Sequence, residues 1–368
     1  MKKRALWALL VVLALVVAAC GDDDGGGDAT TTTEAPAEDT TTTAGTEETT
    51  TTESMDAELG SAERPIQVLF VPSVDAQVIV SGGEIMDEAL TEATGLEFEV
   101  SVPTSYAATI EEMCANPSDT MGFIPAFGYV LASQLCQVDV AFKAVRFGWS
   151  VYWAQFLVPR DSDIQSLEDL DGLSWAYPDP GSTSGFLFPS VALDEAGVEP
   201  GETVEAGDHG PAALAVYNGE VDFATTFFSP PLIEGGQWEF GDPPDIPDDL
   251  VESCAVTEDD ELWCGDYRVL DARASVRTEA PDIVQQVRIL TITDEIPNDT
   301  LSFGPDFPAD LRQQIEGALL EFSQTDAWFD SIGNADFYDW SGIETATDSE
   351  YDIVRVVVDD QGISLEDL

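Results

Sequence analysis

From residue 65 onward, short apolar segments alternate with segments of helical periodicity. Regular alternation of this kind is typical of an α/β sheet with helices packed on its faces, and it excludes all-α and all-β folds. Strands are expected at 66–71, 96–102 and 121–124, and helices at 85–93, 106–113 and 127–135. These six segments predict a first α/β unit.

A second α/β unit is predicted after a long apolar strand at 151–158. Further strands are expected at 173–177, 221–225 and 287–293, and helices at 185–196, 212–218 and 311–323. Residues 229–265 are rich in Pro, Gly and acidic residues and are interpreted as an acidic insertion loop. We therefore predict two lobes, 64–157 plus 291–368 and 158–290. Each is a mostly parallel sheet with flanking helices, and two hinge crossovers lie near Val158 and near 288–293.

The first residues have the pattern of an export signal. Met1-Lys2-Lys3-Arg4 is basic and residues 5–17 are apolar, a run too short for a mature membrane span. Residues 15–20 resemble a bacterial lipobox, which implies cleavage before Cys20 and lipid attachment to it, with an ordinary signal peptide as the alternative. Residues 1–19 are thus a predicted signal peptide. Residues 20–63, rich in Asp, Gly and Thr, are a predicted disordered tether.

The charge balance restricts the partners. Asp and Glu number 72, against 13 Lys and Arg and one His, and the net charge is −59. Nucleic acid is an unfavourable partner because its phosphates require a basic face, and one histidine cannot form a multi-His metal site. We expect no metal and no cofactor. Either a saline habitat or a solubility requirement fits this acidity.

Four cysteines remain beyond Cys20, which suits an exported chain in an oxidising compartment. Local pairing would join Cys114 to Cys136 and Cys254 to Cys264, although the sequence leaves the connectivity open.

Residues 177–189 carry the sharpest chemical signal. An expected strand ends, a turn follows, and Ser182, Thr183 and Ser184 then precede an expected helix. Free backbone N–H groups at a helix start, together with hydroxyl donors, suit a tetrahedral oxyanion. The alternative is an ordinary N-cap, which needs one hydroxyl. An esterase is disfavoured, because Thr183 stands where the hydrolase pattern requires serine.

His209 follows Asp208 at an expected loop-to-helix junction. Asp208 is expected to raise the pKa of His209 and favour an imidazolium that donates to an anion, with a capping or surface histidine as the alternative. We expect no lysine or arginine in this site.

These residues resemble the phosphate, phosphite and phosphonate substrate-binding proteins of ABC transporters, which have the type II periplasmic-binding fold. The resemblance spans roughly residues 65–355, and its specific part is the Ser-Thr-Ser-Gly turn with the later histidine. Its other anchors are residues 104–110, 152–158, 166–172, 218–222, 296–299 and 351–355.

The resemblance implies a role for each site residue. Ser182, Thr183, Ser184 and His209 would hold phosphoryl oxygens, and Tyr106 and Tyr152 would add hydroxyls from the other lobe and its hinge. Asp299 would accept a hydrogen bond from a protonated ligand oxygen or an amine. Where aminoalkylphosphonate-binding members have a second carboxylate, this chain reads Thr226-Phe227-Phe228-Ser229, which disfavours an ammonium-bearing ligand. Without the resemblance, Tyr106 is interpreted as a surface residue and Tyr152 as a core residue.

We therefore expect an extracytoplasmic, lipid-anchored, monomeric solute-binding protein rather than an enzyme. It would bind phosphate, phosphite or an alkylphosphonate and deliver it to an ABC permease and its ATPase. The alternative is a binding or sensor protein of the same fold for another ligand, such as a thiamine precursor or other organic anion. Because of Phe227 and Phe228, a ligand with an apolar tail remains an alternative. An enzyme or a structural surface protein are the remaining classes.

Overall fold

The computed structural model describes residues 57–365. The first lobe is built on a six-stranded sheet in the order β16-β4-β15-β3-β1-β2. β1, β2 and β3 run parallel, and β15 lies antiparallel between β3 and β4. The strands are β1 (Ile66–Phe70), β2 (Phe98–Ser101), β3 (Thr120–Ile124), β4 (Asp139–Val145), β15 (Thr300–Phe303) and β16 (Gly342–Thr345).

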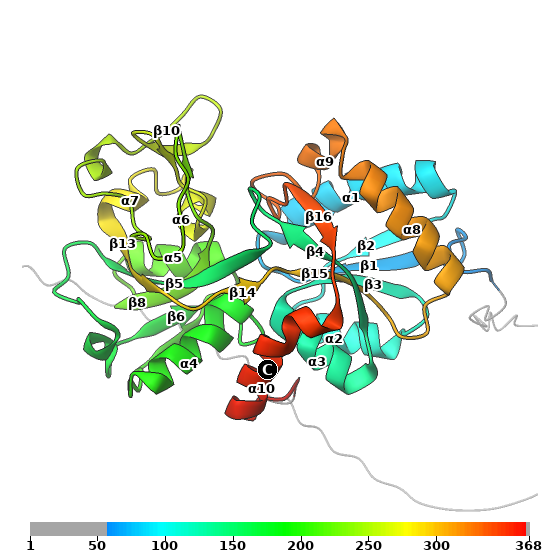
Figure 1. The fold of residues 1–368 in the computed structure, drawn as a ribbon, viewed down its shortest axis with the longest axis horizontal. Helices are drawn as coiled ribbons and strands as arrows, with labels where there is room; N and C mark the ends of the chain where they lie inside the picture. Colours follow the sequence, from blue (N-terminus) through cyan, green and yellow to red (C-terminus); the bar gives the residue numbers. More distant parts are fainter. Residues whose placement is uncertain (1–56, 366–368) are drawn as a thin grey trace, which may run out of the picture. The chain divides into compact units, whose positions relative to one another are not determined.

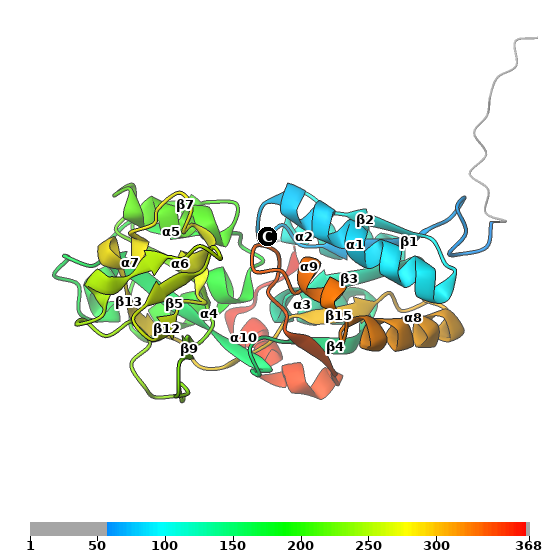
Figure 2. The ribbon, with the colours of Figure 1, turned by 90° about the horizontal axis from the view of Figure 1, so that it is seen from above.

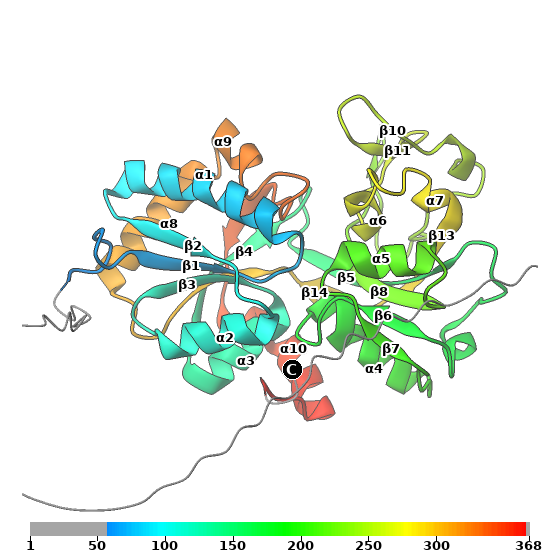
Figure 3. The same cartoon turned by 180° about the vertical axis from the view of Figure 1, so that it is seen from behind.

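Helices cover both faces of this sheet. α1, α8 and α9 lie on one face and α2 and α3 on the other (Figures 1 and 3), and α1 and α8 run side by side (Figure 2). Their bounds are α1 (Ala76–Thr94), α2 (Tyr106–Ala115), α3 (Ala126–Cys136), α8 (Ala309–Phe322), α9 (Asp326–Asp330) and the C-terminal α10 (Asp352–Gln361).

Helix α1 begins nine residues before its predicted start. The predicted helix began at Ile85 because Gly82 and Gly83 interrupt the apolar pattern. A Cβ on Gly82 would meet Phe337 Cδ1 at 2.6 Å, and one on Gly83 would meet Val100 Cγ1 at 2.7 Å. The two glycines therefore allow close packing inside a continuous helix, at a propensity cost of about 1 kcal/mol each.

The second lobe has its own mixed sheet in the order β13-β5-β8-β6-β7, with β14 also paired to β5. Its strands are β5 (Val151–Pro159), β6 (Trp175–Tyr177), β7 (Thr203–Glu205), β8 (Phe223–Phe228), β13 (Val287–Ile292) and β14 (Ile296–Pro297). Its helices are α4 (Phe188–Glu195), α5 (His209–Tyr217), α6 (Ala272–Ser275) and α7 (Ile283–Gln286). This two-sheet α/β architecture matches the predicted fold class. The sheets are mixed and not mostly parallel as predicted, since in each of them two pairings of strands are parallel and three are antiparallel.

The chain changes sheet earlier, and returns later, than expected. β5 pairs with β8 and β13, so residues 151–157 belong to the second sheet and not to the first. The two connecting segments are 146–150 and 298–299. They lie together, since Asn298 donates from Nδ2 to the carbonyl oxygens of Ala144 and Trp149. The run at 151–158, apolar except for Gln155, carries no sign of the change, because β5 is buried along most of its length.

The insertion at 229–265 is not a simple loop. It contains most of a four-stranded antiparallel sheet in the order β10-β11-β12-β9. The strands are β9 (Leu232–Ile233), β10 (Ala255–Val256), β11 (Leu262–Cys264) and β12 (Tyr267–Arg268). Strands of two or three residues are too short to show a period of two, which explains why the sequence predicted only a loop.

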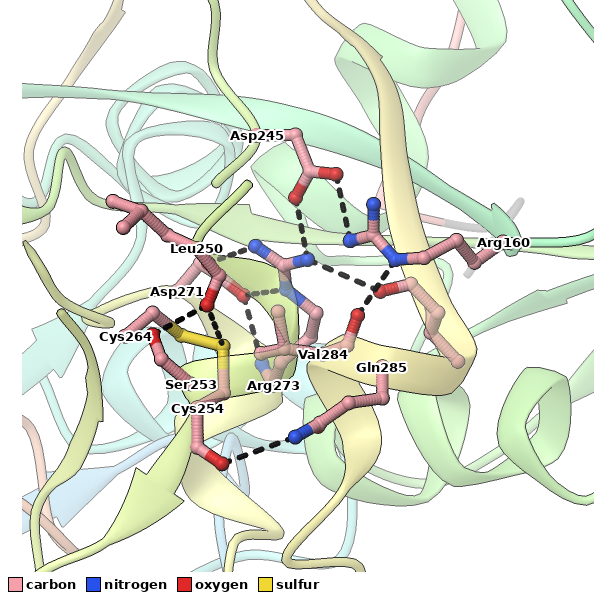
Figure 4. The surroundings of a disulfide bond; sticks show 11 residues. Arg160, Asp245, Leu250, Ser253, Cys254, Cys264, Asp271, Arg273, Val284 and Gln285 are labelled. Carbon is pink, nitrogen blue, oxygen red and sulfur yellow. Dashed lines mark hydrogen bonds and ion pairs between the residues drawn. A yellow bond between two sulfur atoms is a disulfide. The ribbon is translucent and has the colours of Figure 1, made fainter. Parts of the chain in front are cut away.

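Covalent and ionic contacts hold the insertion. Cys254 and Cys264 form a disulfide beside the guanidinium of Arg273, whose side chain is 1% exposed (Figure 4). Arg273 binds Asp271 at 2.9 Å and Asp245 at 2.7 Å, and Arg160 reaches Asp245 at 2.8 Å. A buried cation without these partners would be costly, so the network ties the insertion to the lobe.

The second disulfide, Cys114–Cys136, joins the ends of α2 and α3. Both local pairings of the cysteines are therefore present. The predicted signal peptide, Cys20 and most of the tether lie outside the described residues. Within residues 57–365, no helix is both long and apolar enough to cross a membrane.

Candidate functional site

A cavity of about 90 Å³ is lined by residues of both lobes. Drug-sized ligands occupy pockets of roughly 300 Å³ or more, so this volume indicates a small ligand. Six of the seven predicted ligand-binding residues line it: Tyr106, Tyr152, Ser182, Ser184, His209 and Asp299. The seventh, Thr183, lies beside them but outside the lining.

The Ser-Thr-Ser turn begins the short π-helical segment Thr183–Leu187, which continues into α4, and Ser182 and Ser184 at its start line the cavity. Ser182 is the N-cap, and its Oγ accepts from the Gly185 N–H at 3.0 Å. Its hydroxyl hydrogen is thus free to donate, and the first-turn amides have no acceptor within their helix. Gly185 is required here, because a Cβ would meet Pro178 Cγ at 2.2 Å. The turn presents hydroxyl and amide donors together.

Thr183 has a different place from the one predicted. Its side chain is buried, and its Oγ1 accepts a hydrogen bond from the backbone N–H of Phe127 at 2.9 Å. Phe127 lies in the first turn of α3 in the first lobe, whereas Thr183 belongs to the second. The middle hydroxyl of the turn therefore joins the lobes.

His209 is neutral and not the predicted imidazolium. Burial, with a smaller effect from Arg146, lowers its pKa from 6.5 to about 3. Nδ1 accepts from the Phe227 N–H at 3.3 Å, which assigns the ring proton to Nε2. Asp208 caps α5 through its Oδ1, which accepts from the Gly210 N–H at 2.8 Å, and burial rather than Asp208 decides the pKa of His209.

Both predicted tyrosines are buried donors. Tyr106 is 2% exposed and Tyr152 is 3% exposed. Burial raises the pKa of each phenol above its ordinary value, so both keep their protons. Smaller effects of Ser184 and Thr183 act in the opposite direction on the pKa of Tyr152. Two neutral O–H groups thus complement the serine hydroxyls.

Arg146 is the residue that sequence reasoning missed. It lines the cavity, contrary to the expectation of a site without basic side chains. Its Nη2 donates to Asp299 Oδ2 at 2.9 Å, and its Nε donates to the Tyr338 carbonyl oxygen at 3.1 Å. Arg146 lies in the segment that connects β4 to β5, where no periodicity or motif marks it. Only the scarcity of basic residues could have drawn attention to it.

Two further arginines line the cavity. Arg268 pairs with Glu261 at 3.0 Å, and Arg277 pairs with Asp260 at 2.8 Å. Arg277 also reaches Asp336 of the first lobe at 2.7 Å. Three of the few basic residues in a chain of net charge −59 therefore surround this cavity. They offset three of the five lining carboxylates, Asp299, Glu261 and Asp260, and so make the cavity more favourable for an anion.

We predict that His209 makes stability depend on pH. Native His209 stays neutral down to about pH 3, whereas unfolded His209 takes up a proton near pH 6.5. Stability is therefore lost as pH falls through this range, by at most about 1.4 kcal/mol per pH unit. Denaturant unfolding at pH 8, 6 and 5 should show that His209→Asn gains stability relative to wild type as pH falls. A constant difference would contradict the assignment.

The described residues contain no cluster of His, Cys, Asp or Glu suited to a metal ion. The cavity offers instead hydroxyl, imidazole and amide donors together with the guanidinium groups of Arg146, Arg268 and Arg277. Such a set can bind an oxyanion by hydrogen bonds and charge, without a bond-breaking step.

Comparison with known proteins agrees with this chemistry. A family model described as "ABC transporter, phosphonate, periplasmic substrate-binding protein" matches residues 68–351. The phosphate-import protein PhnD of Mycolicibacterium smegmatis is 25% identical over 319 residues, which are 81% of this chain and 86% of that protein. The phosphonates-binding periplasmic protein of Escherichia coli is 40% identical over 82 residues, covering 20% of this chain and 24% of that protein.

Two solved structures share the fold. A binding protein component of an ABC phosphonate transporter from Pseudomonas aeruginosa has a TM-score of 0.60 and 19% identity, covering 80% of this chain and 85% of that chain. PhnD1 of Prochlorococcus marinus, in complex with methylphosphonate, has a TM-score of 0.59 and 15% identity, covering 81% and 98%.

Proposed function

The chain belongs to the periplasmic substrate-binding proteins of phosphonate ABC transporters, a family of binding proteins rather than enzymes, and we propose that its ligand is a small phosphorus oxyanion. Phosphate, phosphite and a short alkylphosphonate are the candidates. The observation that carries this proposal is the convergence of Ser182, Ser184, Tyr106, Tyr152 and His209 with Arg146 on one small cavity. The relatives named for phosphate import and solved with methylphosphonate support the same ligand class.

Each group has a proposed role. The first-turn amides and the hydroxyls of Ser182 and Ser184 donate to phosphoryl oxygens, with His209 Nε2–H and the two phenols from other directions. Arg146 supplies the positive charge. Asp299 orients Arg146 through their ion pair, and a protonated ligand oxygen can donate to the same carboxylate. Thr183 acts indirectly, by joining the lobes around the ligand.

Transport requires that the cavity open and close. We propose that the lobes move about residues 146–150 and 298–299, and that the closed, loaded form delivers its ligand to a membrane permease and its ATPase. A lipid on Cys20 would keep the monomeric protein at the outer face of the cell membrane, with residues 20–63 as a tether. Export with cleavage before Cys20 belongs to the same proposal.

Isothermal titration calorimetry of the purified protein tests the ligand class. Phosphate, phosphite and methylphosphonate are titrated in turn, with sulfate as the control anion. We expect saturable one-to-one binding of at least one phosphorus compound, and at least tenfold weaker binding of sulfate. The absence of binding by all three phosphorus compounds would refute the proposal.

The Arg277–Asp336 pair gives a prediction for closure. This ion pair joins the second lobe to the first at 2.7 Å, whereas the Arg277–Asp260 pair lies within the second lobe. Asp336 is 53% exposed, so screening limits the pair to at most about 1 kcal/mol. We expect Asp336→Asn to speed ligand dissociation up to about fivefold in stopped-flow measurements. The matched control Asp260→Asn should change the rate less, and equal effects would exclude this role.

A further inference from the structure

Arg146 contacts three groups of the cavity that would otherwise attract a ligand cation: Asp299, Tyr152 and Phe227. The Asp299 side chain is 17% exposed, and its Oδ2 already accepts from Arg146 at 2.9 Å. The Arg146 guanidinium carbon lies 5.7 Å from the ring centre of Tyr152 and 6.0 Å from that of Phe227. These are distances at which aromatic faces stabilise a cation. One arginine thus pairs with one lining carboxylate and lies near two of the aromatic rings of the lining.

The other carboxylates of the lining are compensated in the same way. Asp260 pairs with Arg277, Glu261 with Arg268, and Asp271 with Arg273. Asp339 has no direct ion pair. Burial raises its pKa to about 6, while Arg146, Arg268 and Arg277 act in the opposite direction by stabilising its charge. A ligand ammonium near Asp339 would therefore meet the field of three arginines.

The guanidinium still has donors to offer. Arginine carries five N–H groups, and the hydrogen bonds to Asp299 and Tyr338 use one on Nη2 and the one on Nε. Among the described residues, no acceptor bonds Nη1. Arg146 can therefore bind an oxyanion and remain paired with Asp299.

We infer that Arg146 is a specificity-determining residue, which restricts the site to phosphorus oxyanions without a positive charge and rejects zwitterionic aminoalkylphosphonates. This inference rests on the proposed function and narrows it. An ammonium group would have to displace Arg146 from Asp299 or lie close to its charge, and like charges repel without a solvent shell to screen them.

A matched ligand pair tests the inference. n-Propylphosphonate and 2-aminoethylphosphonate have the same length and differ in a terminal methyl against an ammonium. Phosphate and methylphosphonate are titrated beside them as smaller reference ligands. Of n-propylphosphonate and methylphosphonate, the one that wild-type protein binds more tightly is the uncharged ligand of the comparison. We expect wild-type protein to bind it at least tenfold more tightly than 2-aminoethylphosphonate. Arg146→Gln should weaken binding of the uncharged ligand and reduce the preference at least tenfold, and Arg146→Lys should retain most of it.

A second variant keeps the test decisive if Arg146→Gln folds poorly. Asp299→Asn leaves the guanidinium without its counter-ion, so the preference should increase, and circular dichroism checks the fold of each variant. Wild-type preference for 2-aminoethylphosphonate, or a preference unchanged by both Arg146→Gln and Asp299→Asn, would overturn the inference while the proposed function stood. If wild type bound none of the phosphorus compounds, the proposed function itself would fail.

Discussion

Replacing Ser184 by aspartate is expected to lower affinity for the phosphorus oxyanion about a thousandfold. Ser184 lines the cavity and is buried, so the new carboxylate would face the ligand with little water between them. Two like charges about 4 Å apart repel by roughly 4 kcal/mol at the effective dielectric of such sites. That energy corresponds to about three powers of ten in the dissociation constant. Calorimetry at pH 8, where the carboxylate is charged, measures the effect.

Two controls separate charge from structure. Ser190→Asp places the same carboxylate on the neighbouring helix α4, outside the cavity lining, and should leave affinity within a factor of about three. Ser184→Ala removes one hydroxyl without adding charge and should cost about tenfold. A folded Ser184→Asp protein that binds within tenfold of wild type would show that the turn does not face the ligand.

Loss of the Cys114–Cys136 disulfide is expected to lower the free energy of unfolding by about 3 kcal/mol. The bond joins α2 to α3 across a sequence separation of 22 residues, so it removes considerable freedom from the unfolded chain. The Cys114→Ser/Cys136→Ser double variant, compared with wild type in urea, measures the loss. Ligand affinity should stay within about twofold, because neither cysteine lines the cavity.

The shorter Cys254–Cys264 connection provides the comparison. It joins cysteines 10 residues apart in the sequence. The chain-entropy model therefore gives a loss of unfolding free energy about 0.7 kcal/mol smaller than the loss for Cys114–Cys136. If the Cys114→Ser/Cys136→Ser protein were as stable as wild type, the Cys114–Cys136 disulfide would not restrict the unfolded chain as proposed.

The parts of the fold that could be predicted are those with local signals. The Ser182–Ser184 turn was identifiable because three hydroxyls between a strand and a helix exceed the needs of a cap. The alternation of strand and helix patterns is also a local signal, and it predicted both α/β units. Arg146 could not be found in this way. Its importance depends on pairing with Asp299, 153 residues later in the chain, and no local pattern encodes that contact.

The protonation of His209 shows a second limit. Its sequence neighbour Asp208 suggested an imidazolium, but Asp208 turns away to cap α5, and burial decides the pKa instead. The crossovers were misplaced because strand β5 is apolar except for Gln155, a pattern that fits a place in either sheet. Adjacent residues in a sequence need not act on each other, and burial is a property of the whole lobe.

The hydrogen bond from Phe127 to Thr183 has a practical consequence. Because Phe127 lies in the first turn of α3, its amide has no acceptor within the helix, and the Thr183 hydroxyl is its partner. That partner departs when the lobes separate. The rate at which this one amide exchanges its hydrogen for deuterium should therefore count the spontaneous openings of the protein, and a saturating ligand should slow it.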